Sequence, residues 1–164
     1  MTFFNLENVT IKMNKEKSIE VLNTLIEINN DRIAGYEIAI EETDEADLKT
    51  LFTQLKQTSQ KCNIELSTEV KSLGGSPILG TREIGDIHKA WMDLNSLIKN
   101  NDRIAIFHSC EYGEGITMDM YNEALKNSTD MTAKQKMLLN AQCMLIKADQ
   151  DKVYGIREML SQEV

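Results

Sequence analysis

The segment GGSPILGTREIGDIHKAWMDLNSLIKNN, residues 74–101, separates two pairs of helical patterns and sets the direction of the second pair. It opens on Gly74 and Gly75 and continues to Pro77, the only proline of the chain. These residues end a helix, because glycine accepts a left-handed cap and proline cannot continue the hydrogen-bond ladder. From Ile84 to Ile98 apolar residues recur at helical spacing, which predicts a short helix inside this crossover.

On both sides of the crossover, apolar residues recur three, four and seven positions apart, as on one face of a helix. In the first helix this face comprises Ile19, Leu22, Ile26, Ile33, Tyr36 and Ile40. The pattern predicts helices over about residues 14–42, 44–73, 102–127 and 132–162, each ~40 Å long at 1.5 Å per residue. Asp102 and Thr132 are the expected N-caps of the last two helices. Residues 1–13, with Phe3 and Phe4, are a leader before a single domain over 14–164.

The lengths of the links predict how these helices are connected. Short turns make the first and second helices antiparallel neighbours, and likewise the third and fourth. The crossover is long enough to return along the whole bundle, so that the third helix runs parallel to the second. The predicted fold class is therefore all-α, a ferritin-like four-helix bundle whose long crossover connection carries a short extra helix. The alternative is an up-down-up-down bundle with a fifth helix stacked outside.

Composition excludes several classes of protein. A chain of 164 residues with 41% hydrophobic residues is able to bury the core of one domain, and eight glycines and one proline are too few for an all-β fold. The net charge of -8 argues against nucleic-acid binding. No apolar run is long enough for membrane insertion and no signal peptide is evident, which predicts a soluble, cytoplasmic protein. Three cysteines without a C-x-x-C pair fit neither a disulfide framework nor a zinc ribbon.

Two acidic residues interrupt the apolar face of the third long helix. Glu111 and Glu114 lie near its centre, where aliphatic residues would be expected. The other helices also become polar near their midpoints, for example at Glu65 and Asp149. Because antiparallel helices of matched length bring their midpoints to one height, we expect these side chains to form a polar layer inside the bundle.

A buried carboxylate needs a cation, a hydrogen-bond donor or a proton, so three interpretations of this layer are open. A divalent metal ion, such as Mn or Fe, would be bound by Glu111, Glu114, Asp149 and Glu65. The interpretation we favour is an internal hydrogen-bonded layer in which amide side chains and a basic residue, Arg32, Lys56 or Lys147, neutralise the acids. In the third, the acids are protonated because burial raises their pKa.

A normal di-iron centre is not expected in this chain. Di-iron bundles take ligands from two Glu-x-x-His pairs, whereas the residues three positions before His88 and His108 are Gly85 and Ala105. No Glu-x-x-His sequence therefore occurs, and half of the usual ligand pattern is missing.

Glycines inside the predicted helices indicate close packing. Gly113 and Gly115 each cost about 1 kcal/mol relative to alanine in a helix interior. We expect another element to pack closely there, and Gly35 and Gly155 to serve the same purpose. A local π-bulge is the alternative. Trp91 is predicted to anchor the crossover onto the bundle.

Several segments resemble one protein family. They are LNTLIEINNDRIAGYEIAIEE (22–42), DLKTLF (47–52), LGGSPILGTREIGDIHKAWMDL (73–94) and CEYGE (110–114). The chain is similar, from about Lys17 to Met159, to an uncharacterised bacterial family of ferritin-like four-helix bundles described only as a domain of unknown function. The resemblance implies the crossover topology and no established activity.

Together these observations predict a non-enzymatic ferritin-like bundle without a cofactor, a stress-associated or interaction protein that forms a homo-oligomer. The alternative is a carboxylate-rich metal-binding or metal-dependent redox protein without a normal ferroxidase centre.

Overall fold

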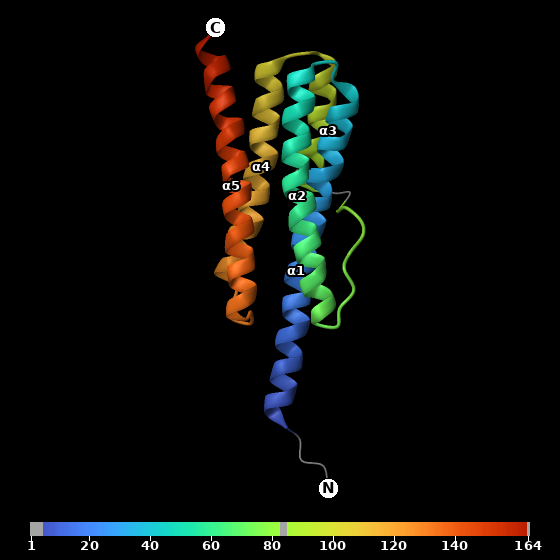
Figure 1. Ribbon diagram of the computed structural model, residues 1–164, viewed down its shortest axis with the longest axis vertical. Coiled ribbons are helices and arrows are strands. Elements are labelled where there is room, and N and C mark those ends of the chain that lie inside the picture. The colour runs from blue at the N-terminus through green and yellow to red at the C-terminus, as the bar shows by residue number, and fades with distance from the viewer. Residues whose placement is uncertain (1–4, 83–84, 164) are drawn as a thin grey trace.

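The computed structural model describes residues 5–82 and 85–163, and over these ranges the chain is all-α. The helices are α1 (Leu6–Glu42), α2 (Ala46–Ser72), α3 (Asp86–Lys99), α4 (Arg103–Lys126) and α5 (Ala133–Gln162), packed as a bundle (Figure 1). None of these described helices is both long and apolar enough to cross a lipid bilayer. Phe3, Phe4 and Ile84, which entered the sequence-based expectations, lie outside the described residues.

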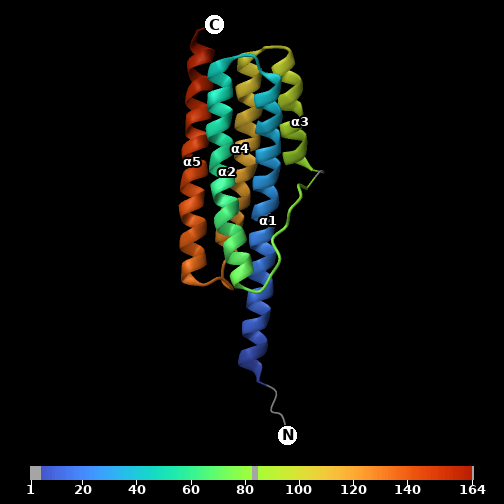
Figure 2. The same ribbon diagram turned by 45° about the vertical axis from the view of Figure 1, so that its right-hand side comes forward.

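The four long helices form two antiparallel pairs. In Figures 1 and 2, α1 and α5 run toward the same end of the bundle, and α2 and α4 run toward the opposite end. The chain after α2 returns along the outside of the bundle and enters α3, which lies beside one half of α1. The crossover therefore makes a lengthwise return and leaves α4 parallel to α2.

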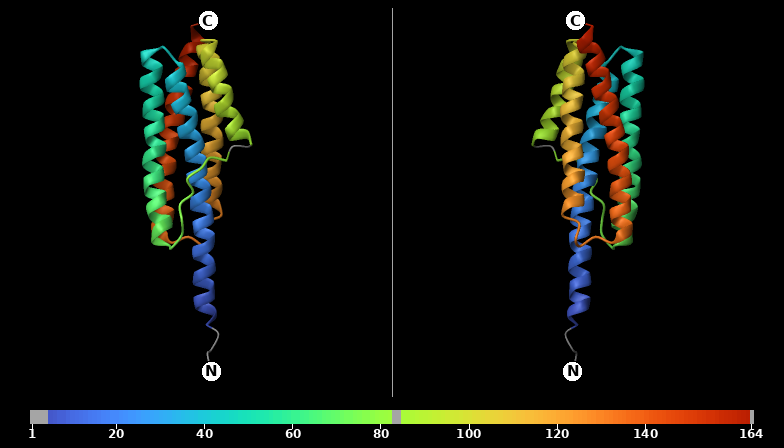
Figure 3. Two further views of the ribbon diagram at one scale, coloured as in Figure 1. Left: turned by 90° about the vertical axis from the view of Figure 1, so that its right-hand side faces the viewer. Right: turned by 90° about the vertical axis from the view of Figure 1, so that its left-hand side faces the viewer.

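Each helical hairpin packs mainly within itself. α1 packs along α2, and α4 packs along α5. α3 contacts both α1 and α4 and so joins the two hairpins, as the views from either side show (Figure 3). α3, the extra helix in the crossover, therefore links the two hairpins.

The helix boundaries agree with the sequence pattern except at the start of the chain. α2, α4 and α5 lie within two residues of the ranges 44–73, 102–127 and 132–162. The expected start of the first helix near residue 14 is wrong, because α1 begins at Leu6. The side chain of Asn5 caps it by accepting a hydrogen bond from the backbone N–H of Glu7 at 3.0 Å. Most of the expected leader is therefore helix, and it extends α1 beyond the rest of the bundle (Figure 1).

Two predicted caps are confirmed. Asp102 accepts a hydrogen bond from the backbone N–H of Ala105 at 3.2 Å at the start of α4. Thr132 and Gln135 form a reciprocal capping box at the start of α5, in which each side chain accepts from the other residue's backbone N–H. The caps explain why these two helices begin where the sequence pattern predicted.

The apolar core is divided into two clusters along the bundle axis. One contains Phe52, Trp91 and Phe107, and the other contains Leu22, Leu66 and Leu139. Between them lies a set of buried polar side chains, which we call the polar layer: Asn29, Arg32, Ser59, Glu114, Thr117 and Gln142. The predicted change from apolar to polar side chains at mid-height is confirmed.

Trp91 fills the space that two glycines leave open. A Cβ atom on Gly35 of α1 would lie 2.7 Å from the Trp91 Cβ, and one on Gly113 of α4 would lie 2.8 Å from the Trp91 indole ring. The indole is 3% exposed and also contacts the Tyr36 ring at 4.8 Å between centroids. The predicted roles of Trp91, Gly35 and Gly113 are confirmed. They are not confirmed for Gly115 and Gly155, where an added Cβ would have no close neighbour.

Candidate functional site

Arg32 is the centre of the polar layer. It lies on α1 with no exposed surface, and its Nε donates to both carboxylate oxygens of Glu114 on α4, at 2.9 and 3.1 Å. One terminal nitrogen donates to the Leu55 carbonyl and to Ser59 Oγ on α2, both at 2.8 Å. The other donates to Asp149 Oδ2 on α5 at 2.9 Å. A single guanidinium therefore joins all four long helices.

One cation, Arg32, is shared by two carboxylates at the centre of the bundle. Burial disfavours the guanidinium charge, but Glu114, Tyr36 and Asp149 raise the pKa of Arg32 above its usual range, so it stays a cation. Burial also raises the pKa of Glu114, and Arg32 and Tyr36 oppose that rise. Asp149 is 19% exposed, so its carboxylate keeps some contact with water. The interpretation in which Arg32 is the internal partner of the central acids fits this geometry.

Tyr36 completes the environment of Glu114. Its hydroxyl donates to Glu114 Oε1 at 2.5 Å, one turn of α1 beyond Arg32. Burial and then the nearby Glu114 raise the pKa of Tyr36 well above its usual range, which keeps the hydroxyl protonated and able to donate. Glu114 thus has donors from two residues of α1.

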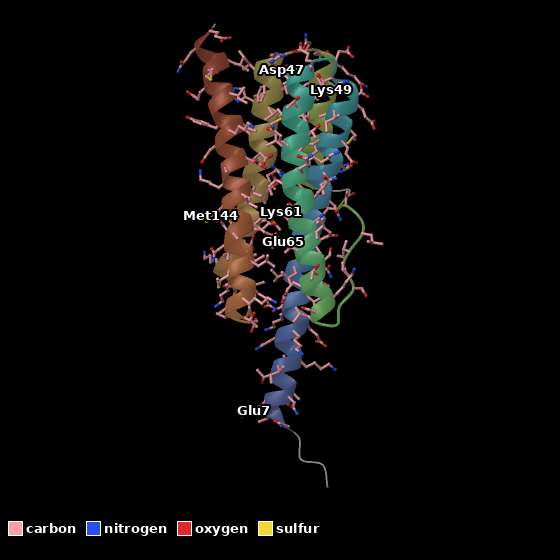
Figure 4. The ribbon with its side chains drawn as sticks, viewed as in Figure 1. Glu7, Asp47, Lys49, Lys61, Glu65 and Met144 are labelled. Atoms are coloured by element: carbon pink, nitrogen blue, oxygen red, sulfur yellow. The ribbon has the colours of Figure 1, made fainter. Side chains whose placement is uncertain are left out.

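A second group of hydrogen bonds extends the polar layer toward the other end of the bundle. Asn29 Nδ2 donates to the Tyr121 hydroxyl at 2.9 Å, and that hydroxyl donates to Gln142 Oε1 at 2.8 Å. Gln142 Nε2 donates to the Cys62 carbonyl at 3.1 Å and to Glu65 Oε1 at 3.2 Å. Glu65, labelled in Figure 4, therefore lies at the edge of this group and interacts with an amide.

The expected position of Glu111 in the core is wrong. Its side chain is 26% exposed, and it accepts from Arg157 Nε of α5 at 2.7 Å, with His108 Nδ1 at 3.9 Å. Cys110, one residue earlier, takes the buried position instead, with no exposed surface. Glu111 thus belongs to a surface ion pair and does not face the polar layer.

The four predicted metal ligands do not form one shared ligand set. Glu114 and Asp149 share the Arg32 guanidinium, whereas Glu111 is paired with Arg157 and Glu65 with Gln142. In the described part of the chain, no group of three or more His, Cys, Asp or Glu side chains is arranged to hold a metal ion. The residues at this layer fit a guanidinium and do not fit a dinuclear metal centre.

Surface hollows lie away from the guanidinium. A hollow of about 180 Å³ between α1 and α4 is lined by Val21, Met120 and Glu123 among others, toward the end of the bundle beyond the layer. Another, along the outer face of α4, is lined by His108, Glu111 and Tyr112 among others. Neither includes Arg32, Tyr36 or Glu114, which have no exposed surface. Arg32, Tyr36 and Glu114 are therefore closed to solvent, whereas Asp149 is partly exposed.

A model of a protein family described as a domain of unknown function (DUF2383) matches residues 17–127, which is more than half of the chain. The chain belongs to the DUF2383 family. The matched range includes Arg32, Tyr36, Ser59 and Glu114, and it ends before α5, which supplies Asp149 and Gln142. The expected membership of a family described as a domain of unknown function, from about Lys17 to Met159, is thus confirmed for residues 17–127. No curated protein matches the sequence.

Sequence reasoning missed three hydroxyl groups of this site in the DUF2383 chain, those of Tyr36, Thr117 and Tyr121. Tyr36 and Thr117 lie at helical spacing from Arg32 and Glu114, but an aromatic residue and a threonine in an apolar stripe resemble ordinary core residues. The available signal was the position of Tyr36, one turn from a basic residue on the inner face of the same helix.

Burial of the cysteines predicts a loss of stability in alkaline solution. Burial raises the pKa of the Cys62 thiol to about 11, and burial followed by the Glu114 charge raises the pKa of Cys110 further. These thiols stay protonated in the folded state, while the unfolded chain releases their protons above about pH 9. The free energy of unfolding should therefore fall as pH rises from about 9 toward 11, by up to about 1.4 kcal/mol per pH unit for each group.

Urea unfolding at a series of pH values from about 8 to 11 measures this slope. The double variant Cys62→Ala/Cys110→Ala should have a shallower slope than the wild type, whatever its absolute stability. Cys143→Ala is the control, because this thiol is only half-buried and should change the slope less. An unchanged slope in the double variant would contradict the assignment.

Proposed function

We propose that this protein is a non-enzymatic, ferritin-like bundle that acts by binding other proteins, and that its polar layer is structural. The observation that carries the proposal is the position of Arg32. Its guanidinium already satisfies Glu114 and Asp149, the two carboxylates nearest the bundle centre. Both carboxylates already have a cationic partner, which a metal ion would have to displace, and neither Glu114 nor Arg32 has exposed surface for a substrate to contact.

The order and direction of the helices support the ferritin-like part of the proposal. Two antiparallel hairpins are joined by a connection that returns along the bundle, with α2 and α4 parallel (Figure 1). Among helical bundles, one long crossover of this kind is the ferritin-like arrangement. α3 then occupies the crossover and closes one side of the bundle through Trp91.

Fixing helix register is the role that the hydrogen bonds support. Arg32 contacts α2, α4 and α5 at once, so sliding any of these helices by one turn would separate a guanidinium from a buried carboxylate or from a carbonyl. A buried charge left without a partner costs several kcal/mol. The layer therefore favours one alignment over others that apolar clusters alone would tolerate.

Metal analysis tests the structural role of the layer. Protein purified without chelator should contain far less than one equivalent of Mn, Fe or Zn per chain. Addition of chelator should leave the melting temperature unchanged, because removal of a ligand bound only to the folded state would lower it. Glu114→Gln and Glu111→Gln should have the same low metal content as the wild type.

The same metal analysis also defines the result that would contradict the proposal. One equivalent of metal that is lost in Glu114→Gln but retained in Glu111→Gln, together with a chelator-dependent melting temperature, would contradict the proposal and support a carboxylate metal site.

A further inference from the structure

One face of α5 carries apolar side chains that no other described helix covers. Along this face every residue is separated from the next by three or four positions, and we call the set the α5 seam: Lys134, Met137, Ala141, Met144, Ala148 and Asp151. Met137 is 72% exposed and Met144 is 73% exposed. α5 forms one edge of the bundle, with Met144 on its outer side (Figures 1 and 4).

The spacing of the α5 seam is that of a coiled coil. Alternation of three and four positions is the narrow stripe that packs against a second helix, with each side chain entering a hole on the partner. The buried residues of α5, such as Gln142 and Ile146, are on the other side of the helix and already contact the bundle. α5 therefore carries two faces with helical periodicity, of which only one is used within the chain.

We propose that the α5 seam binds the same seam of a second copy of the chain, as a two-fold symmetric, antiparallel helix pair. With the two-fold axis between Ala141 and Met144, residues at a and d positions face each other across the pair. Met137 then faces Ala148 of the partner subunit, Ala141 faces Met144 of the partner subunit, and Lys134 faces Asp151 of the partner subunit. Each large side chain is opposite a small one, and each cation is opposite an anion.

Charge selects this orientation over a parallel pair. In a parallel pair each position faces itself, so Lys134 would face a second lysine and Asp151 a second aspartate, which is unfavourable. Within one chain, Asp151 accepts from Lys147 Nζ at 2.7 Å and Lys134 Nζ lies 4.0 Å from Glu69. The Lys147–Asp151 pair is largely exposed and Lys134 is 86% exposed, so these contacts contribute little and leave both seam charges available.

The same residues also select the register. Sliding one helix by seven positions would place Asp151 opposite Ala141, in the middle of the apolar contact, where a carboxylate has no partner. In the proposed register both charged residues are at the ends of the contact and the four apolar residues are in the middle. Apolar centre and charged rim are the usual arrangement of a protein interface.

The inference rests on the proposed function in that it names a partner for a protein that acts by binding. Sedimentation equilibrium over a concentration series should show a reversible dimer for the wild type. Met144→Asp should raise the dimer dissociation constant by about tenfold or more, because it places a carboxylate in the apolar centre. Met92→Asp on α3 is the matched control, since Met92 is also an exposed methionine, at 47%, and lies outside the α5 seam.

A charge exchange tests orientation and register. Lys134→Glu and Asp151→Lys, each alone, should raise the dissociation constant by about tenfold, because each creates two like-charge contacts by symmetry. The double variant Lys134→Glu/Asp151→Lys should return it to within about threefold of the wild type, because opposite charges again face each other. Circular dichroism should be unchanged in all variants, since every substituted side chain is exposed.

Three outcomes would overturn the inference: a wild-type monomer at every attainable concentration, a dimer unaffected by Met144→Asp, or a charge exchange that restores nothing. None of them changes the metal content or the response to chelator. Failure of the α5 seam is therefore distinguishable from failure of the structural role proposed for the polar layer.

Discussion

Replacing Arg32 with methionine should lower the free energy of unfolding by about 3–5 kcal/mol, the range for breaking a buried ion pair from one side. Methionine has a similar length and fills much of the space, so the loss is mainly electrostatic. Glu114 would remain buried with only the Tyr36 hydroxyl as donor, and the Leu55 carbonyl and Ser59 would lose their partner. Urea unfolding followed by circular dichroism at pH 7.5 measures the change.

A second substitution separates charge from packing. Arg32→Met/Glu114→Leu replaces both charges with apolar groups, and such replacements are often neutral or stabilising. The double variant should therefore be more stable than Arg32→Met alone. Arg157→Met, which breaks the surface pair with Glu111, is the control and should have a much smaller effect. A double variant less stable than the single one would show that the polar layer contributes through its hydrogen bonds rather than by cancelling charge.

Replacing Trp91 with alanine should also lower the free energy of unfolding by about 3–5 kcal/mol, because it leaves a large cavity. The cavity would lie between α1 and α4, against Gly35, Gly113 and the Tyr36 ring. α3 would lose a side chain that contacts both hairpins. Relative to the wild type, the exchange rate of the α3 amide protons should therefore increase much more than that of the α2 amide protons. Hydrogen exchange detected by mass spectrometry resolves these two helices.

Two glycines of α4 are a matched test of the Trp91 contact. Gly113→Ala places a Cβ 2.8 Å from the indole and should destabilise the protein, although alanine is the better helix former. Gly115→Ala meets only Gln150 Nε2, at 3.9 Å, and should stabilise it by up to about 1 kcal/mol. Equal effects of the two substitutions would contradict the close approach. Met92→Ala, an exposed position of the same helix as Trp91, should change little.

Helix positions were predictable because their signals are local. Asp102, Thr132 and the Gly74–Pro77 segment act through adjacent backbone groups, so the residues alone indicate where helices begin and end. Close packing at Gly113 was predictable for a similar reason, since glycine is unfavourable in a helix unless something approaches it. The leader was misjudged because the Asn5 cap lies before a stretch of α1 that extends past the other helices and shows no strong apolar stripe.

The inner face of α1 was less predictable. Its buried residues include Leu22, Leu25, Asn29, Arg32, Tyr36 and Ala39, which alternate three and four positions apart. A stripe built from apolar residues alone passes instead through Ile33 and Ile40, which are only partly buried. The inner face becomes continuous once Asn29 and Arg32 are allowed inside, and their burial depends on partners that other helices supply.

Glu111 and Glu114 show the same limit for two residues of a single helix. Both lie near the middle of α4, and spacing alone does not decide which of two acids one turn apart is buried. Cys110 occupies the buried position next to Glu111, and Arg157 of α5 holds Glu111 at the surface. Which of the two glutamates is buried thus depends on side chains more than forty positions away in the chain. A local sequence pattern carries no information about these side chains.

The contact between Arg32 and Glu114 has an evolutionary consequence. Both side chains are fully buried. A substitution that removes one charge therefore leaves the other buried without its partner, and the protein stays destabilised until the second charge is also replaced. Substitutions at these two sites should therefore be inherited together across the DUF2383 family, whereas Glu111 and Arg157 should diverge independently. An aligned set of family members in which position 114 varies freely beside a constant arginine at position 32 would contradict this expectation.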